Sequence, residues 1–160
     1  MTSGASIRPE QLVFALIRSD LHWISTPTRR VIQLLATSAP REMSAHRLAR
    51  WSGLGNRHQL ARALARDGLP SLADLRSWIR LVGWVLAWES DRSSLYRLAI
   101  AQNLNPAVCF RMIKRLTGSR WSEVRSRGVA WVLLQFRDRC VIRTTGVRSV
   151  TLSRRQHGGR

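Results

Sequence analysis

Arginine side chains are the most abundant groups in this sequence that could do chemistry. The 160 residues carry 27 basic and 9 acidic side chains, for a formal net charge of +18, and Lys114 is the only lysine. Guanidinium groups form paired hydrogen bonds with phosphate oxygens and with the edge of guanine. A field this positive attracts a polyanion. We expect nucleic acid as the first candidate partner and an acidic membrane surface as the second.

Residue patterns for catalysis or metal binding are missing from the sequence. Cys109 and Cys140 form no CxxC motif, and the four histidines show no ligand spacing relative to them or to each other. There is no Ser-His-Asp set, no pair of carboxylates and no glycine-rich phosphate loop, and acidic residues are too scarce for two-metal nuclease chemistry. The sequence therefore predicts a protein that is not an enzyme and that needs neither a metal nor a cofactor.

Membrane contact is a weaker interpretation than nucleic-acid binding. The chain opens without a secretory signal pattern, and its longest apolar stretch, LRSWIRLVGWVLAW at 75–88, is too short to cross a bilayer and contains Arg76 and Arg80. This stretch also lies between two segments rich in turn signals, which favours a connecting helix over a membrane-active one. We expect no membrane partner and a cytoplasmic, nucleoid-associated location in a bacterium.

The elements that must position the basic residues come from an internal repeat. Residues 46–68 read HRLARWSGLGNRHQLARALARDG and residues 96–118 read YRLAIAQNLNPAVCFRMIKRLTG. Each copy predicts a short helix, a turn, a second helix and a closing glycine, with Gly53 and Asn103 suited to a left-handed turn. This pattern is typical of a helix-turn-helix unit. Leu60 with Phe110, and Ala63 with Ile113, are expected to form the inner face of the second helices.

The rest of the chain predicts an all-α fold around these two units. We expect an N-terminal helix extension over 1–26 that packs on its own domain, a first helix-turn-helix unit over 27–70, a long linker helix over 71–90 and a second unit over 91–137. Residues 138–160 form a basic tail, either a hairpin around Thr145–Gly146 or a disordered segment. The seven tryptophans, Trp51 among them, are expected to be core or helix-packing residues.

The repeat resembles the DNA-binding domain of the AraC/XylS family of bacterial regulators over residues 27–127. Leu98-Ala99 and Asn103-Leu104 stand where the family has an Ile-Ala pair before a Gly-Phe turn, and Gly118 follows as in the family. Other positions depart from the family pattern. Phe110 lies one position late, Arg120-Trp121 replaces Thr-Pro, and Val124-Arg125 replaces an aromatic-Arg pair. The resemblance implies a divergent, short member without a ligand-sensing domain.

The second helix of a helix-turn-helix enters the major groove, and the first crosses the DNA backbone. Arg57 and Arg111 match positions where the family commonly places base readers; if the register slips by one residue, Arg62 and His58 take over those roles in the first unit. The base-facing candidates are Asn56, Arg57, His58, Arg62, Ala107, Val108 and Arg111. The phosphate-binding candidates are Arg29, Arg30, Arg47, Arg50, Arg97, Lys114 and Arg115.

Together these features predict a transcriptional regulator that binds double-stranded DNA sequence-specifically and reads two successive major grooves as a monomer or weak dimer. RNA polymerase or another regulator is a further candidate partner. An architectural or mobile-element DNA-binding protein without a direct role in transcription is the alternative.

Overall fold

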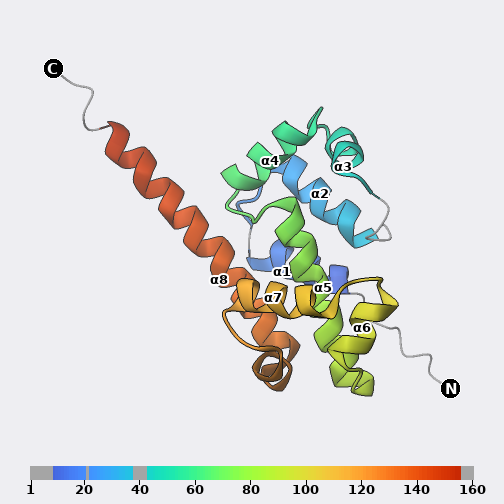
Figure 1. Ribbon diagram of the computed structural model, residues 1–160. Helices are drawn as coiled ribbons and strands as arrows, with labels where there is room; N and C mark the ends of the chain where they lie inside the picture. The colour runs from blue at the N-terminus through green and yellow to red at the C-terminus, as the bar shows by residue number, and fades with distance from the viewer. Residues whose placement is uncertain (1–8, 21, 38–42, 156–160) are drawn as a thin grey trace.

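The computed structural model describes residues 9–20, 22–37 and 43–155, with side chains described as far as residue 140, and within these ranges it contains helices and no strand. The all-α prediction is therefore confirmed for the described residues. Figure 1 shows two helix pairs arranged along a long central helix, with a second long helix leading to the C-terminus. The helices are α1 (Pro9–Asp20), α2 (Thr26–Thr37), α3 (Ala45–Trp51), α4 (Arg57–Arg66), α5 (Leu72–Asp91), α6 (Leu95–Ala101), α7 (Pro106–Thr117) and α8 (Trp121–Arg155).

Polar side chains fix where five of these helices begin. Ser44, Asn56, Ser71, Ser94 and Asn105 each accept a backbone N–H from the first turn of the helix that follows. Such a cap satisfies a donor that the helix itself leaves unpaired, and replacing it by alanine costs about 1 kcal/mol. The helix starts are thus encoded locally in the sequence.

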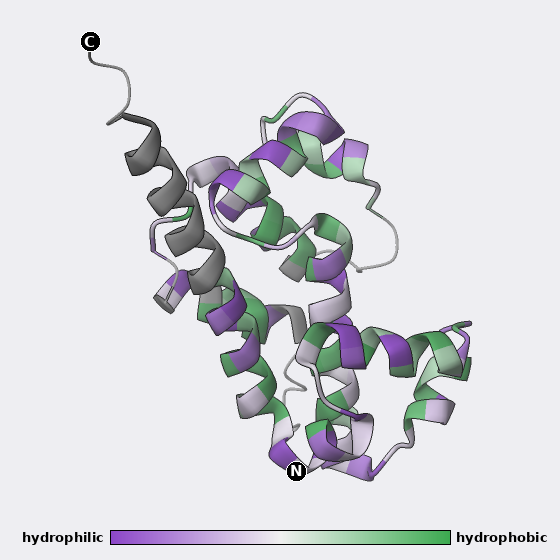
Figure 2. Ribbon diagram, turned by 60° about the vertical axis from the view of Figure 1, so that its left-hand side comes forward, coloured by the Kyte–Doolittle hydropathy of each residue, from purple (hydrophilic) through white to green (hydrophobic). Residues whose placement is uncertain are grey.

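Helix α5 provides the centre of the hydrophobic core. Seven of its residues are buried: Leu75, Trp78, Ile79, Leu81, Val82, Trp84 and Val85. Helices α1, α7 and α8 pack against it, and Trp78 meets Phe136 of α8 edge to face with ring centroids 5.7 Å apart. Green and purple residues alternate along the helices in Figure 2, as amphipathic helices require. The expected packing of the N-terminal helix on its own domain is also observed, since α1 contacts α2, α5 and α8.

Asp67 joins the segment between α1 and α2 to the end of α4. Its carboxylate accepts hydrogen bonds from the Ser25 backbone N–H at 2.9 Å and the Ser25 hydroxyl at 2.5 Å, and its backbone carbonyl accepts the Trp23 indole N–H at 3.4 Å. Burial raises the pKa of Asp67, but the hydrogen bonds from Ser25 and Thr28 outweigh it, so the pKa lies below the ordinary value. Asp67 therefore binds the N-terminal segment to the first helix pair as a carboxylate.

Helix α8 differs from the prediction for the C-terminal region. The hairpin expected around Thr145–Gly146 is wrong, because the backbone is helical as far as Arg155. The weak alternation in this segment is too irregular to identify a strand. The helix is interrupted at Gly128, whose φ of 81° and ψ of 176° are not helical, and Glu89 of α5 accepts the Val129 backbone N–H at 2.9 Å where the helix resumes. Residues 156–160 lie outside the described residues.

The prediction for the tryptophans is correct in part. Trp78, Trp84 and Trp121 are buried, and the half-buried Trp88 lies beneath the Arg125 guanidinium, 4.3 Å from the ring centroid. Trp51 is the exception, with 60% of its surface exposed. It is the last residue of α3, and its neighbours Leu48 and Ala49 are the residues that this short helix turns inward.

Candidate nucleic-acid interface

The two helix pairs, α3 with α4 and α6 with α7, share the same turn geometry. The Ala49 carbonyl accepts the Leu54 N–H at 2.8 Å, and the Ala99 carbonyl accepts the Leu104 N–H at 2.9 Å. Between them Gly53 has a φ of 81° and Asn103 a φ of 54°, so both turns pass through the left-handed region at the same place. Ala49 and Ala99 are fully buried. A larger side chain at either position would hold the two helices of the pair apart. The repeat predicted from the sequence is present in the backbone hydrogen bonds.

The second helices of the two pairs, α4 and α7, however, begin 49 residues apart, one residue less than the 50-residue spacing of the repeat. Ser44 and Ser94 are 50 residues apart, as are Leu54 and Leu104, but the capping residues Asn56 and Asn105 are 49 apart. Gly55 is the extra residue in the first turn, and its φ of 69° is again left-handed. The spacing of 50 returns at Gly68 and Gly118, because α7 is longer than α4.

This shift overturns the predicted pairing of Leu60 with Phe110. Leu60 is buried, but 47% of the Phe110 surface is exposed, and Cys109 takes the inward position with only 3% exposed. Burial raises the pKa of the Cys109 thiol, which suits a packing role. The inner faces are therefore Leu60, Ala63 and Leu64 in α4, and Cys109, Ile113 and Leu116 in α7. The inward prediction for Ile113 is correct, although its counterpart in position is Leu64.

Aligning α4 and α7 at their capping asparagines also changes which outward-facing residues occupy equivalent positions in the two helices. Arg62 and Arg111 are both the sixth residue of their helices, and His58 corresponds to Ala107. Arg57 corresponds to Pro106, so the residue of α4 that is equivalent to Arg111 is Arg62 and not Arg57. All the base-facing candidates are exposed on the surface: Asn56, Arg57, His58, Arg62, Ala107, Val108 and Arg111. Gln59, which corresponds to Val108, is also exposed and was missed, because the ungapped repeat concealed its position.

Helices α4 and α7 lie at different heights along the central helix α5 (Figure 1). In Figure 1, α4 lies above the start of α5 and α7 crosses α5 further down, and both run from right to left in that view. Contacts between α5 and α7 fix the second pair, whereas the first pair is held by α2, which packs on both α3 and α4. Helices α4 and α7 are thus held in place by different helices of the same domain.

The phosphate-binding candidates fall into two groups. Arg30, Arg47, Arg50, Arg97 and Lys114 are exposed. Arg29 and Arg115 are exposed as well, but their guanidinium groups already bond within the protein. Arg29 donates to the His22 carbonyl at 3.3 Å, and Arg115 forms a 2.6 Å ion pair with Asp74 of α5.

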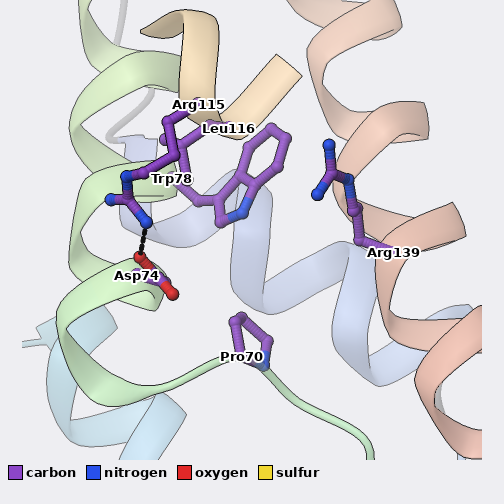
Figure 3. Close-up of a pocket in the computed structure, with 6 residues that line it drawn as sticks. All are labelled: Pro70, Asp74, Trp78, Arg115, Leu116 and Arg139. Carbon is purple, nitrogen blue, oxygen red and sulfur yellow. Dashed lines mark hydrogen bonds and ion pairs between the residues drawn. The ribbon is translucent and has the colours of Figure 1, made fainter. Parts of the chain in front are cut away.

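That ion pair belongs to a small pocket where the start of α5, the end of α7 and the middle of α8 meet. Figure 3 shows Asp74, Arg115 and Arg139 around Trp78, with Pro70 below. The cavity measures about 130 Å³, well below the range of roughly 300–1,000 Å³ that small-molecule sites occupy. We interpret it as part of the packing contact that orients α7 relative to α5.

The two helix pairs are strongly basic. Helices α3, α4, α6 and α7 contain nine arginine or lysine residues and no acidic residue. The acidic side chains nearby are used in structure: Asp67 is buried with Ser25, Asp74 pairs with Arg115, and Glu89 caps Val129. Two of the nine cations are paired with these carboxylates, Arg66 with Asp67 at 3.4 Å and Arg115 with Asp74 at 2.6 Å, and Asp91 interacts electrostatically with Arg97. The positive charge of the two helix pairs is therefore compensated only in part.

A groove that is separate from the pocket at Asp74 lies between α7 and the start of α8, and sequence reasoning missed it. Phe110 and Trp121 line it with Arg111, Lys114, Arg120, Ser122 and Arg125. The equivalent place in the first pair is lined by small residues of α4, Ala61 and Ala65, and by the start of α5. The exposure of Phe110 follows from the register shift and could not be read from the ungapped repeat.

Potential metal ligands do not gather in the described part of the chain. It contains no group of three or more histidine, cysteine or acidic residues arranged to hold a metal ion. None of the helices in that part is long and apolar enough to cross a membrane.

Comparison with protein-family models, with curated proteins and with solved structures finds no match to this chain.

Proposed function

We propose that this protein binds double-stranded DNA sequence-specifically, that α4 and α7 are its two recognition helices, and that it regulates transcription. One observation carries the proposal: two separate helices begin at an asparagine cap, expose their first turns and place an arginine at the sixth position. A duplicated surface of this kind suits a ligand that itself repeats, as the DNA major groove does.

In the proposed complex each helix pair is a helix-turn-helix unit. The second helix lies in the major groove, and its N-terminal half faces the base edges. Arg62 and Arg111 are the principal base readers, because a guanidinium can bond O6 and N7 of guanine together. Arg47 and Arg50 of α3 and Arg97 of α6 lie on the first helices, where contacts to the phosphate backbone are expected.

Helix α5 connects the two readers: α4 ends shortly before its first turn, and the end of α7 is paired with Asp74 in that turn. Its 20 residues give a length of about 30 Å at 1.5 Å per residue. One turn of DNA is roughly 34 Å long, and we propose that a single chain places α4 and α7 in successive major grooves on one face of the duplex. No second copy of the chain is then required for a two-part site.

The resemblance of residues 27–127 to the AraC/XylS regulators is in keeping with this function, and we propose that the chain is a divergent relative. The positive charge of the pairs agrees with both transcriptional regulation and the architectural alternative. RNA polymerase or another regulator would be contacted only in the first case.

Selection of binding sites from random duplex DNA separates the two. Wild-type protein is expected to enrich one motif of about 15–20 base pairs, with two conserved blocks centred about 10 base pairs apart. The double variant Arg62→Ala/Arg111→Ala should still bind DNA but enrich a motif with relaxed selection in both blocks. Enrichment of no motif by the wild-type protein would contradict sequence-specific regulation and leave the architectural role.

A further inference from the structure

The two second helices carry different chemistry at corresponding positions. The second and third residues are His58 and Gln59 in α4, but Ala107 and Val108 in α7. All four are exposed, and 49% of the Val108 surface faces solvent. The arginines at the sixth position are shared, and the inference concerns the first turn, where the side chains of α4 can form hydrogen bonds and those of α7 cannot.

Apolar side chains on this face of α7 are not needed by the core. The helix is packed through Cys109, Ile113 and Leu116, while Ala107 and Val108 stand beside Arg111 on the outward side. Exposed apolar area has a hydration cost that is recovered when it contacts another apolar group. On the major-groove edges of the four bases, the C5-methyl group of thymine is the apolar group available.

We infer that α7 reads thymine through Ala107 and Val108, next to a guanine contact from Arg111. Helix α4, by contrast, reads hydrogen-bonding edges through His58, Gln59 and Arg62, since glutamine pairs with N6 and N7 of adenine. This inference rests on the proposed function. The binding site is therefore asymmetric: the half bound by α7 depends on thymine methyl groups, and the half bound by α4 does not.

The test removes only those methyl groups. In the selected motif, each thymine is replaced by deoxyuridine, which keeps the base pair and its hydrogen bonds. Arg62→Ala and Arg111→Ala identify the two halves, because each variant relaxes selection in the half that its own helix contacts. Uracil in the α7 half is expected to weaken binding about four-fold for each contacted methyl group, the value that the burial of one methylene gives. Uracil in the α4 half should leave the affinity unchanged.

Val108→Gln and Gln59→Val form a matched pair of variants. Both positions are exposed, so neither substitution disturbs the core, which circular dichroism can verify. Val108→Gln should bind thymine and uracil equally at the position that Val108 contacts. Gln59→Val should retain the full uracil effect in the α7 half.

The outcomes separate the inference from the function it rests on. If a two-part motif is selected but uracil is tolerated in both halves, the thymine contact is wrong and sequence-specific binding stands. The thymine contact is equally wrong if uracil weakens binding only in the α4 half. If no motif is selected, the proposed function itself fails.

Discussion

Arg62 and Arg111 occupy the same position in two different helices, the sixth residue of α4 and of α7, although they are 49 residues apart in a chain whose turns repeat every 50. Both side chains are exposed, and neither helix contains an acidic residue that could neutralise them. Two equivalent cations held on two separate helices are the basis of the proposed function.

Replacing either arginine should affect one half of the DNA site. Arg62→Ala or Arg111→Ala is expected to weaken specific binding by about 1–3 kcal/mol and to relax selection at one base pair, because a bidentate guanine contact is lost. Arg62→Lys and Arg111→Lys keep the charge but not the paired donors. They should lose specificity while retaining most of the non-specific affinity. Fluorescence anisotropy titrations with specific and scrambled duplexes measure both quantities.

The affinity should depend strongly on salt. If Arg30, Arg47, Arg50, Arg97 and Lys114 each neutralise one phosphate, the slope of log K against log salt concentration should be about −4 to −5. Arg47→Ala should make the slope less steep by roughly one unit. Arg115→Ala is the control, because its guanidinium is paired with Asp74 and it should change the slope less. An affinity independent of salt would argue against phosphate binding altogether.

Asp67→Asn should lower stability at neutral pH by about 2 kcal/mol, because charge-assisted hydrogen bonds from Ser25 are weakened. The pKa of Asp67 is lower in the folded protein than the value of about 3.9 in unfolded chains. Its contribution is therefore complete above the unfolded pKa and is lost as the pH falls through the folded pKa. Thermal unfolding of both proteins from pH 7 to pH 3 should show a difference that shrinks below about pH 4. A difference that stays constant across this range would mean that the carboxylate charge is unimportant.

Gly128→Ala should destabilise the protein more than Gly53→Ala. Both glycines have a φ of 81°, so both substitutions carry a conformational penalty. It is about 1–2 kcal/mol for a residue in the left-handed region and about 1–3 kcal/mol for Gly128, whose ψ of 176° is essentially restricted to glycine at this φ. A Cβ at Gly53 meets no atom within 4 Å, whereas one at Gly128 would lie 2.8 Å from Glu89 Oε1. Glu89 would have to move and release the Val129 N–H. Urea unfolding measures the two losses, and equal losses would show that the contact between α5 and α8 contributes little.

The register of α7 can be checked by stability alone. Ile113→Ala should cost about 2–5 kcal/mol, the usual range for a fully buried residue, and Phe110→Ala should cost far less. Guanidinium chloride unfolding of the two variants makes the comparison. A larger loss for Phe110→Ala would restore the inner face that the ungapped repeat predicted.

Local signals made most of the helical architecture predictable. Ser44, Asn56, Ser94 and Asn105 cap the short helices in the structure, and Gly53 and Asn103, which were expected at left-handed turns, have positive φ. The alignment of α4 with α7 was not predictable from the 50-residue repeat. The first turn contains the extra residue Gly55, but α7 is longer than α4, so the two copies of the repeat have the same total length. The two asparagine caps, 49 residues apart, were the available signal.

Other features depended on tertiary contacts that leave little trace in sequence. Trp51 lies at the end of a seven-residue helix whose small inward face is already filled by Leu48 and Ala49. The ion pair of Arg115 with Asp74 joins residues 41 positions apart, so its guanidinium could not be distinguished in advance from a free phosphate-binding one. Helix α8 continues past the predicted end through a segment whose composition suggested a hairpin.

The most direct measurement is methylation interference at guanine N7 on the selected duplex, with wild-type protein, Arg62→Ala and Arg111→Ala. This position lies in the major groove, where α4 and α7 are proposed to bind. We expect two patches of interference about 10 base pairs apart on one face of the DNA, with each variant abolishing a different patch. A single patch, or the loss of the same patch in both variants, would contradict a chain that reads two major grooves with two helices.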